Sequence, residues 1–111
     1  MPLPNIVEPP SDERGFDSWA YAHAVDHLEI ITAITKSQNV TLPQYQIWPI
    51  DPNDIENFLQ QHTQAHNDMN LQMGTPGNDL NNVDFKNNDQ AKQWFYLNSE
   101  EHRNVRQKLA I

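Results

Sequence analysis

Residues 19–34 read WAYAHAVDHLEIITAI, and the same pattern recurs at residues 58–73 and 94–109. In each copy an aromatic residue is followed four positions on by His or Asn and eight positions on by His, and apolar residues follow at positions eleven and fifteen. Steps of four, four, three and four residues keep these positions on one face of an α-helix. The pattern therefore predicts three related helices, each with a polar pair in the middle of its inward face.

Length and composition favour one small domain. The chain has 111 residues, enough for a single hydrophobic core. Its formal net charge is -8, and its seven Lys and Arg residues form no basic cluster, so we expect no nucleic-acid partner. There is no cysteine, which excludes disulfides and thiolate metal sites. No apolar run is long enough to span a bilayer and the N-terminus lacks the pattern of a secretory signal, so we expect a cytoplasmic protein without a membrane partner.

Helix start and stop signals give approximate bounds for three helices. The first is expected to start at Asp17 or Ser18, either of which can cap it. The second has a strong start signal, Asp-Pro-Asn-Asp at 51–54, and ends at the glycine and proline of residues 74–77. We predict an all-α three-helix bundle with helices at about 18–36, 52–73 and 89–109, in a single domain of residues 17–111.

Two segments outside these helices contain several prolines. Residues 1–16 predict an extended N-terminal arm, which would dock on the domain or on a neighbouring subunit through Leu3, Ile6 and Val7. Residues 38–51 predict an extended strap over the bundle, held by Leu42, Tyr45 and Trp48. An edge strand is the alternative for the strap, although its prolines disfavour one.

The connections between the predicted helices are longer than the short loops that force neighbouring helices to run antiparallel. They allow all three helices to run in the same direction, although the sequence leaves this open. In a parallel bundle the equivalent positions of the three copies meet in layers. The expected order is an aromatic layer, a layer of His23, His62 and Asn98, a layer of His27, His66 and His102, and two aliphatic layers.

The histidine layers have three interpretations. In the first, they are internal hydrogen-bonded networks that fix the register of the helices. In the second, the imidazoles of His27, His66 and His102 bind zinc or another divalent transition metal, with His23 and His62 nearby. The acidic residues next to these histidines would then orient them, and the candidates are Asp26, Glu29, Asp68 and Glu101. In the third, the histidines lie mostly exposed on an imperfectly buried face.

Enzymatic signatures are missing from the sequence. No serine lies in a nucleophile elbow, no glycine-rich loop is present to hold a phosphate, and no HExxH motif occurs. An open three-histidine zinc site would be the only route to catalysis. We therefore expect a non-enzymatic protein, and no cofactor unless the histidines bind a metal.

The whole chain resembles the small acidic accessory virion proteins of tailed bacteriophages. The resemblance depends on the proline-rich arm, the missing cysteines, the abrupt C-terminus, and the segments FDSWAYAHAVDHLEI (16–30) and QAKQWFYLNSEEH (90–102). It implies a structural role in capsid decoration or head-tail joining, with other subunits of the virion as partners, after assembly in the host cytoplasm. The alternative function is a small metal-binding helical bundle that uses the three-histidine layer.

Overall fold

The computed structural model describes residues 13–45 and 55–111 of the chain. This part contains three helices, α1 (Glu13–Gln38), α2 (Ile55–Met73) and α3 (Asn88–Leu109), and no strand. None of these helices combines the length and the apolar character needed to cross a membrane. The predicted all-α three-helix bundle is confirmed.

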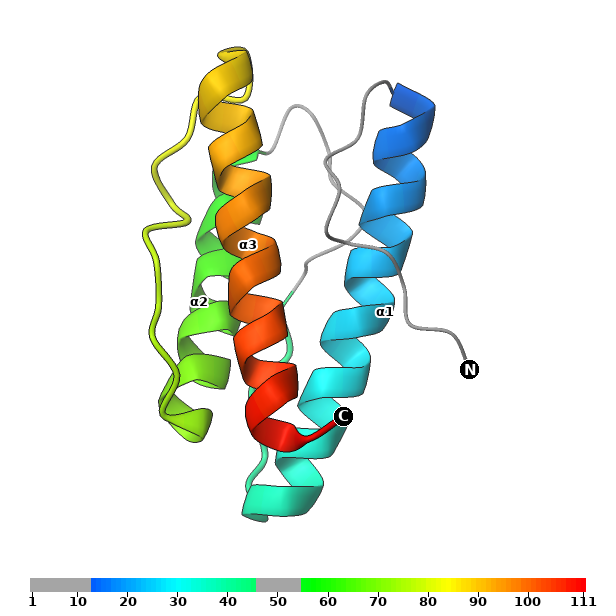
Figure 1. The fold of residues 1–111 in the computed structure, drawn as a ribbon, viewed down its shortest axis with the longest axis vertical. Helices are drawn as coiled ribbons and strands as arrows, with labels where there is room; N and C mark the ends of the chain where they lie inside the picture. Colours follow the sequence, from blue (N-terminus) through cyan, green and yellow to red (C-terminus); the bar gives the residue numbers. More distant parts are fainter. Residues whose placement is uncertain (1–12, 46–54) are drawn as a thin grey trace.

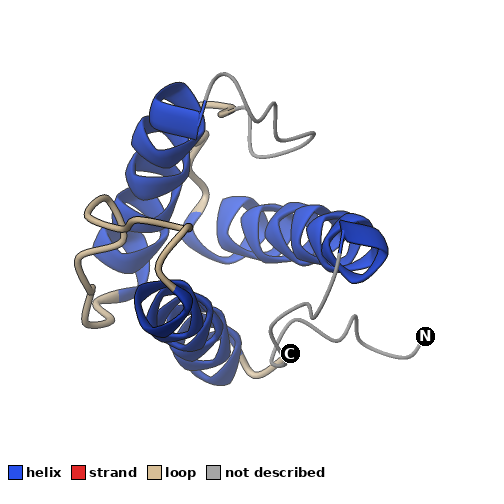
Figure 2. Ribbon diagram, turned by 90° about the horizontal axis from the view of Figure 1, so that it is seen from above, coloured by secondary structure: helices blue, strands red, loops and turns tan. Residues whose placement is uncertain are grey.

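All three helices run in the same direction. In Figure 1 each helix starts near the top of the molecule and ends near the bottom. Seen from above in Figure 2, the helices surround a common axis. Because the three helices start at the same end of the bundle, the equivalent positions of the three sequence copies lie at the same height.

The predicted helix bounds are confirmed at the C-terminal ends to within two residues, but the start of α1 differs. It begins at Glu13, so residues 13–16 of the predicted extended arm are helical. Gly15, which lies within the predicted arm, is part of α1. One glycine in a helix interior costs only about 1 kcal/mol, which is too little to stop a long packed helix. The remaining predictions for the arm and strap lie outside the described residues, at Leu3, Ile6, Val7 and Trp48.

Local signals fix both ends of α3 and the end of α2. Asn87 caps α3, because its side-chain oxygen accepts hydrogen bonds from the backbone N–H groups of Asp89 and Gln90. Ala110 ends α3 in the left-handed conformation, at φ 59°. Gly74 adopts φ 65° directly after α2, a conformation that glycine reaches without steric cost.

Two hydrophobic clusters lie above and below the histidines along the bundle axis. The upper cluster contains the predicted aromatic layer together with neighbouring apolar residues: Trp19, Ala20, Phe58, Leu59, Leu80, Trp94 and Phe95. The lower cluster contains the aliphatic layers: Ile30, Ile34, Met69, Met73 and Val105, with Leu109 packed against them. Burial of these side chains on one inward face per helix drives the association of the three helices.

Both connections pack against the helices. In the strap, Leu42 packs on the lower cluster, and the Tyr45 hydroxyl donates a 2.8 Å hydrogen bond to Asp68 of α2. In the second connection, Leu80 is fully buried, and its carbonyl accepts a 2.8 Å hydrogen bond from Nε1 of Trp94. These contacts hold the described part of each connection against the helices.

Candidate metal centre

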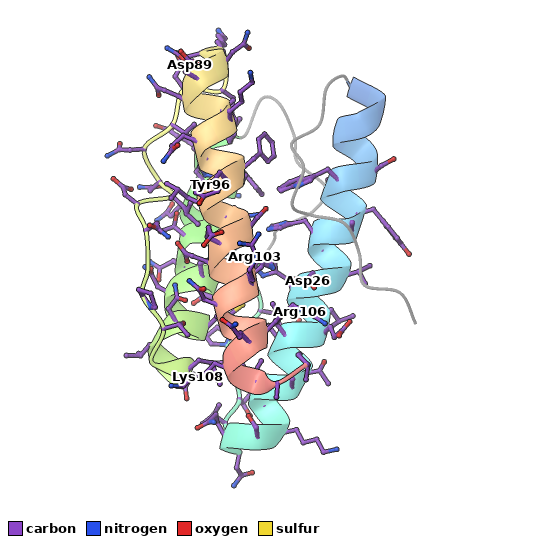
Figure 3. All side chains as sticks on the ribbon, in the orientation of Figure 1. Asp26, Asp89, Tyr96, Arg103, Arg106 and Lys108 are labelled. Carbon is purple, nitrogen blue, oxygen red and sulfur yellow. The ribbon has the colours of Figure 1, made fainter. Side chains whose placement is uncertain are left out.

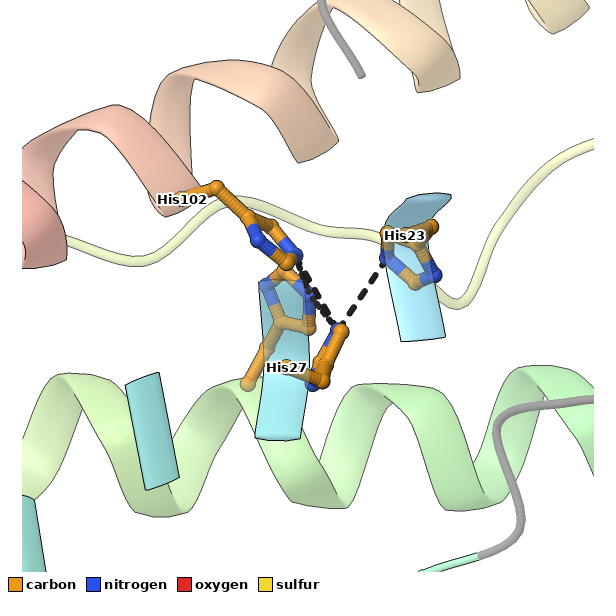
Figure 4. Close-up of side chains that lie close together, drawn as sticks. His23, His27 and His102 are labelled. Atoms are coloured by element: carbon orange, nitrogen blue, oxygen red, sulfur yellow. Dashed lines mark hydrogen bonds between the residues drawn. The ribbon is translucent and has the colours of Figure 1, made fainter. Parts of the chain in front are cut away.

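All five histidines of the chain meet in the centre of the bundle. They come from the inward faces of all three helices, and each is at most 2% exposed to solvent. The two predicted polar layers form as expected: His23 and His62 contact Asn98, while His27, His66 and His102 contact one another. Figure 4 shows His27 between His23 and His102.

The second layer is a nearly equilateral triangle of imidazole nitrogens. Nε2 of His27 lies 3.1 Å from Nε2 of His66 and 3.0 Å from Nε2 of His102. The third side of the triangle, between His66 and His102, is 3.1 Å. Three potential lone-pair donors from three different helices therefore point at one spot on the bundle axis.

Two of these imidazoles are held from behind by buried carboxylates. Nδ1 of His66 donates a 3.0 Å hydrogen bond to Glu101 of α3, and Nδ1 of His102 donates a 2.6 Å hydrogen bond to Asp26 of α1. Both carboxylates are at most 2% exposed. A carboxylate behind a histidine in this way fixes the tautomer and raises the basicity of the nitrogen that faces the metal in known metal sites.

The hydrogen-bond pattern dictates where the lone pairs lie. In the neutral form of each ring, the single N–H of His66 and of His102 lies at Nδ1, where it donates to Glu101 and to Asp26. Their Nε2 atoms are then both acceptors, 3.1 Å apart, with no proton between them. A single N–H from His27 cannot form two well-aligned hydrogen bonds at once, so in these protonation states the triangle leaves a lone pair free for a cation on its axis.

The triangle has dimensions that suit a transition-metal ion. With metal–nitrogen bonds of about 2.1 Å, neighbouring donors lie about 3.0 Å apart in an octahedral site and about 3.4 Å apart in a tetrahedral one. The observed sides of 3.0 to 3.1 Å match an octahedral face as they stand. An outward shift of each ring by about 0.2 Å gives the spacing of tetrahedral zinc.

His23 supplies a fourth nitrogen on the polar side of the triangle. Its Nε2 lies 3.1 Å from Nε2 of His27, and ligand atoms of His23, His27, His66 and His102 all lie within 4.8 Å of one another. The opposite side of the triangle faces the apolar Ile30, Met69 and Val105 layer. A metal ion would therefore take its fourth donor from the side of His23.

The layer of His23, His62 and Asn98 is neutral and less completely hydrogen-bonded. The Asn98 side-chain oxygen lies 3.1 Å from Nε2 of His23 and 2.9 Å from Nε2 of His62. Nδ1 of each histidine and the Asn98 amide nitrogen are buried without a hydrogen-bond partner. No described acidic residue forms a hydrogen bond in this layer, so it lacks the negative charge that accompanies the triangle below it.

Burial lowers the pKa of four histidines in this site. Desolvation lowers the pKa of His23, His27 and His62 well below the usual value of 6.5. Desolvation likewise lowers the pKa of His102 to about 4, although the hydrogen bond to Asp26 opposes this shift.

Burial raises the pKa of Glu101, but hydrogen bonds from His66, Asn70 and Asn78 outweigh it and leave that pKa below its usual value. Neutral imidazoles beside an ionised carboxylate are the protonation states that metal binding requires.

The two carboxylates accept further hydrogen bonds from residues that the sequence pattern did not indicate. Arg106 donates 2.8 Å hydrogen bonds to both Asp26 and Glu29, and Figure 3 shows Asp26 and Arg106 between α1 and α3. Glu101 accepts hydrogen bonds from the Asn70 side chain at 2.7 Å and from the Asn78 backbone N–H at 2.8 Å. These hydrogen bonds fix the orientation of the carboxylates, which in turn orient the imidazoles.

The predictions for the acidic residues are confirmed in part. Asp26 and Glu101 contact histidines directly, whereas Glu29 is linked to the site only through Arg106. Among the described residues, Asp68 forms no hydrogen bond with a histidine, and its carboxylate accepts one from Tyr45 instead. Asp68 lies two residues after His66, so it points about 200° away from that histidine on α2, towards the opposite face of the helix.

Alignment of the three sequence copies contains a signal for the missed residues. Asp26 and Glu101 occupy the same place in their copies, directly before the second histidine. Asn70 and Arg106 also share a place, four residues after that histidine and on the same helix face. A carboxylate in one copy is thus paired with a histidine and a hydrogen-bond donor from a neighbouring copy.

Comparison of the chain with protein-family models, curated proteins and solved structures found no match. The predicted resemblance to virion proteins therefore stays a prediction, as do the predicted partners and the expected lack of catalysis.

Proposed function

We propose that the protein is a metal-binding helical bundle in which one divalent transition-metal ion ties the three helices together. The ligands are Nε2 of His27, His66 and His102, one from each helix, with His23 as the fourth donor. Imidazole ligands suit zinc, nickel, copper and iron, and an all-histidine set without thiolates is compatible with each of them. A four-nitrogen set leaves no open position, as in sites with a structural role.

The observation that carries this proposal is the pair of carboxylate-held histidines. Glu101 and Asp26 direct the N–H groups of His66 and His102 away from the axis, so two lone pairs converge at 3.1 Å. A purely structural network would be expected to alternate donors and acceptors, since a buried acceptor that faces another acceptor lowers stability. A metal ion on the axis would bind both acceptor nitrogens, so that each lone pair forms a coordination bond.

A metal titration of the metal-free protein, purified without a histidine tag, tests the proposal. Isothermal titration calorimetry with zinc, cobalt and nickel should give one ion per chain for at least one of these metals. His66→Ala should lower the affinity at least 100-fold, because it removes one of the three nitrogens of the triangle. Gln64→Ala, at an exposed position on the same helix, is the matched control and should bind as the wild type does.

Two results would contradict the proposal. One is a protein that binds none of the metals and whose melting temperature does not change with added metal or chelator. The other is binding that survives in His66→Ala with the wild-type stoichiometry and affinity, because such an ion would lie elsewhere on the surface.

A further inference from the structure

The three sequence copies give the metal centre an approximate threefold arrangement with one part missing. Asp26 of α1 accepts hydrogen bonds from His102 and Arg106 of α3. Glu101 of α3 accepts hydrogen bonds from His66 and Asn70 of α2. Each of these pairs of helices forms one unit of the arrangement. If the same pattern continued around the axis, a third unit would place a carboxylate of α2 beside the histidine of α1.

In the third unit the chain has no carboxylate. The place of Asp26 and Glu101 is taken in the second copy by Ala65, and the place of Asn70 and Arg106 is taken in the first copy by Ile31. Among the residues that the structure describes, His27 is therefore the one member of the triangle without a carboxylate behind it. Within residues 13–45 and 55–111, no hydrogen bond involves Nδ1 of His27, although the side chain is only 2% exposed.

A pocket lies at this position. It has a volume of about 340 Å³, and His27, Ile31 and Ala65 line it together. Leu28 and Pro43 extend its apolar wall, and Tyr45 of the strap lies at its edge. A pocket of this volume lies within the range of small-molecule binding sites.

We infer that this pocket binds a small monocarboxylate, whose carboxylate accepts a hydrogen bond from Nδ1 of His27 and whose apolar body packs on Ile31 and Ala65. The inference rests on the proposed function, because a metal at Nε2 of His27 places the ring N–H at Nδ1. A histidine bound to a metal almost always donates this N–H to a carboxylate, a carbonyl or water. The bound acid takes the role that Asp26 and Glu101 have in the other two units.

The charges of the centre favour an anion at this position. A divalent ion and the Arg106 guanidinium outweigh the carboxylates of Asp26 and Glu101 by one unit of charge. Glu29 also pairs with the outer edge of the guanidinium at 2.8 Å, but its side chain is 42% exposed, so its charge lies at the surface and outside the buried part of the centre. A monocarboxylate next to His27 neutralises the remaining charge within the protein interior.

The size and composition of the pocket define the class of acid. Its wall is mainly apolar, so an aliphatic chain of a few carbons is favoured over a hydroxy acid or a dicarboxylate. Butyrate is a suitable probe, and butyramide has nearly the same shape without the charge. A difference between these two ligands therefore reports the recognition of the carboxylate.

Calorimetric titration of the zinc-loaded full chain with each probe tests the inference. Butyrate should bind at one site per chain, at least tenfold tighter than butyramide. Ala65→Leu fills the pocket and should weaken butyrate binding at least tenfold while zinc affinity is retained. Gln64→Leu, which adds the same side chain at the neighbouring exposed position, should leave both affinities unchanged.

A gain-of-function variant gives an independent readout. Ala65→Glu places a carboxylate from α2 beside His27, so zinc affinity should rise about tenfold and butyrate should no longer bind. Equal binding of butyrate and butyramide, or no binding of butyrate to zinc-loaded protein, would overturn the inference and leave the proposed function intact. Failure to bind zinc in the same samples would overturn both.

Discussion

At the scale of single residues, the centre combines histidines that are evident in the sequence with partners that are not. The five histidines could be placed together because they share a face within each copy of the pattern. Arg106 and Asn70 could not, because their partners Asp26 and Glu101 lie on other helices and far away in sequence. Such contacts depend on the rotation of one helix relative to another, which hydrophobic periodicity leaves undetermined.

Replacement of Glu101 by glutamine tests the role of the carboxylates. Glu101→Gln keeps the size of the side chain but removes the negative charge behind His66, and we expect metal affinity to fall 10- to 100-fold. Competition with a chromophoric chelator measures this change. Glu100→Gln is the control: its carboxylate pairs with the exposed Arg103, away from the histidines, so affinity should stay within twofold. Equal losses in both variants would contradict a specific role for Glu101.

Acidification should destabilise the metal-free protein. The pKa values of four of the buried histidines lie below 6.5 in the fold, and that of His102 is about 4. As the pH falls below 6.5, the unfolded chain takes up protons that the folded protein excludes, so stability decreases continuously towards pH 4. We expect a loss of about 1 kcal/mol or more per pH unit, measured by urea unfolding between pH 7.5 and 4.5. Constant stability from pH 7.5 to 5 would indicate solvated histidines instead.

At the scale of the elements, the second connection contributes contacts to the histidine site. Trp94 of α3 binds the Leu80 carbonyl, and the Asn78 N–H binds Glu101. Thr75 donates a 2.7 Å hydrogen bond to Asn70, which in turn donates to Glu101. The packing of Leu80 could be expected from its spacing in the sequence. The backbone contact from Asn78 to Glu101 could not, because it depends on the path of the connection, which periodicity does not encode.

Truncation of Trp94 should destabilise the fold through this element. Trp94→Ala removes a side chain that is 3% exposed and packs against Phe58, Phe85 and Phe95. We expect a loss of about 3 to 5 kcal/mol in the free energy of unfolding. Tyr96→Ala, two residues away on the outer face and 57% exposed in the wild type, should cost less than about 1 kcal/mol. Chemical denaturation compares the two variants, and similar losses would argue against the aromatic layer as a core.

Removal of the helix cap gives a smaller, local effect. The Asn87 side chain accepts from two backbone N–H groups at the start of α3, so Asn87→Ala should lower stability by about 1 kcal/mol. The neighbouring Asn88 lies inside the helix and is exposed, so Asn88→Ala should change stability little. Thermal unfolding followed by circular dichroism measures both, and equal values would show that the cap contributes nothing.

At the scale of the whole molecule, the repeat determines the fold. Three copies of one pattern with long connections place like positions at one height, which produces aromatic, polar and aliphatic layers. The layers follow from the sequence once the helices run in parallel. Ala65 and Ile31 break the threefold arrangement, but this is recognisable only once the contacts of the other two units are known. The pocket next to His27 lies at these two residues.

Anomalous X-ray diffraction from crystals of the metal-loaded protein tests the central claim most directly. Data collected at the absorption edge of the bound metal should give one peak per chain on the bundle axis, about 2.1 Å from Nε2 of His27, His66 and His102. A map without a peak at this position, with the three imidazoles hydrogen-bonded only to one another, would contradict the account.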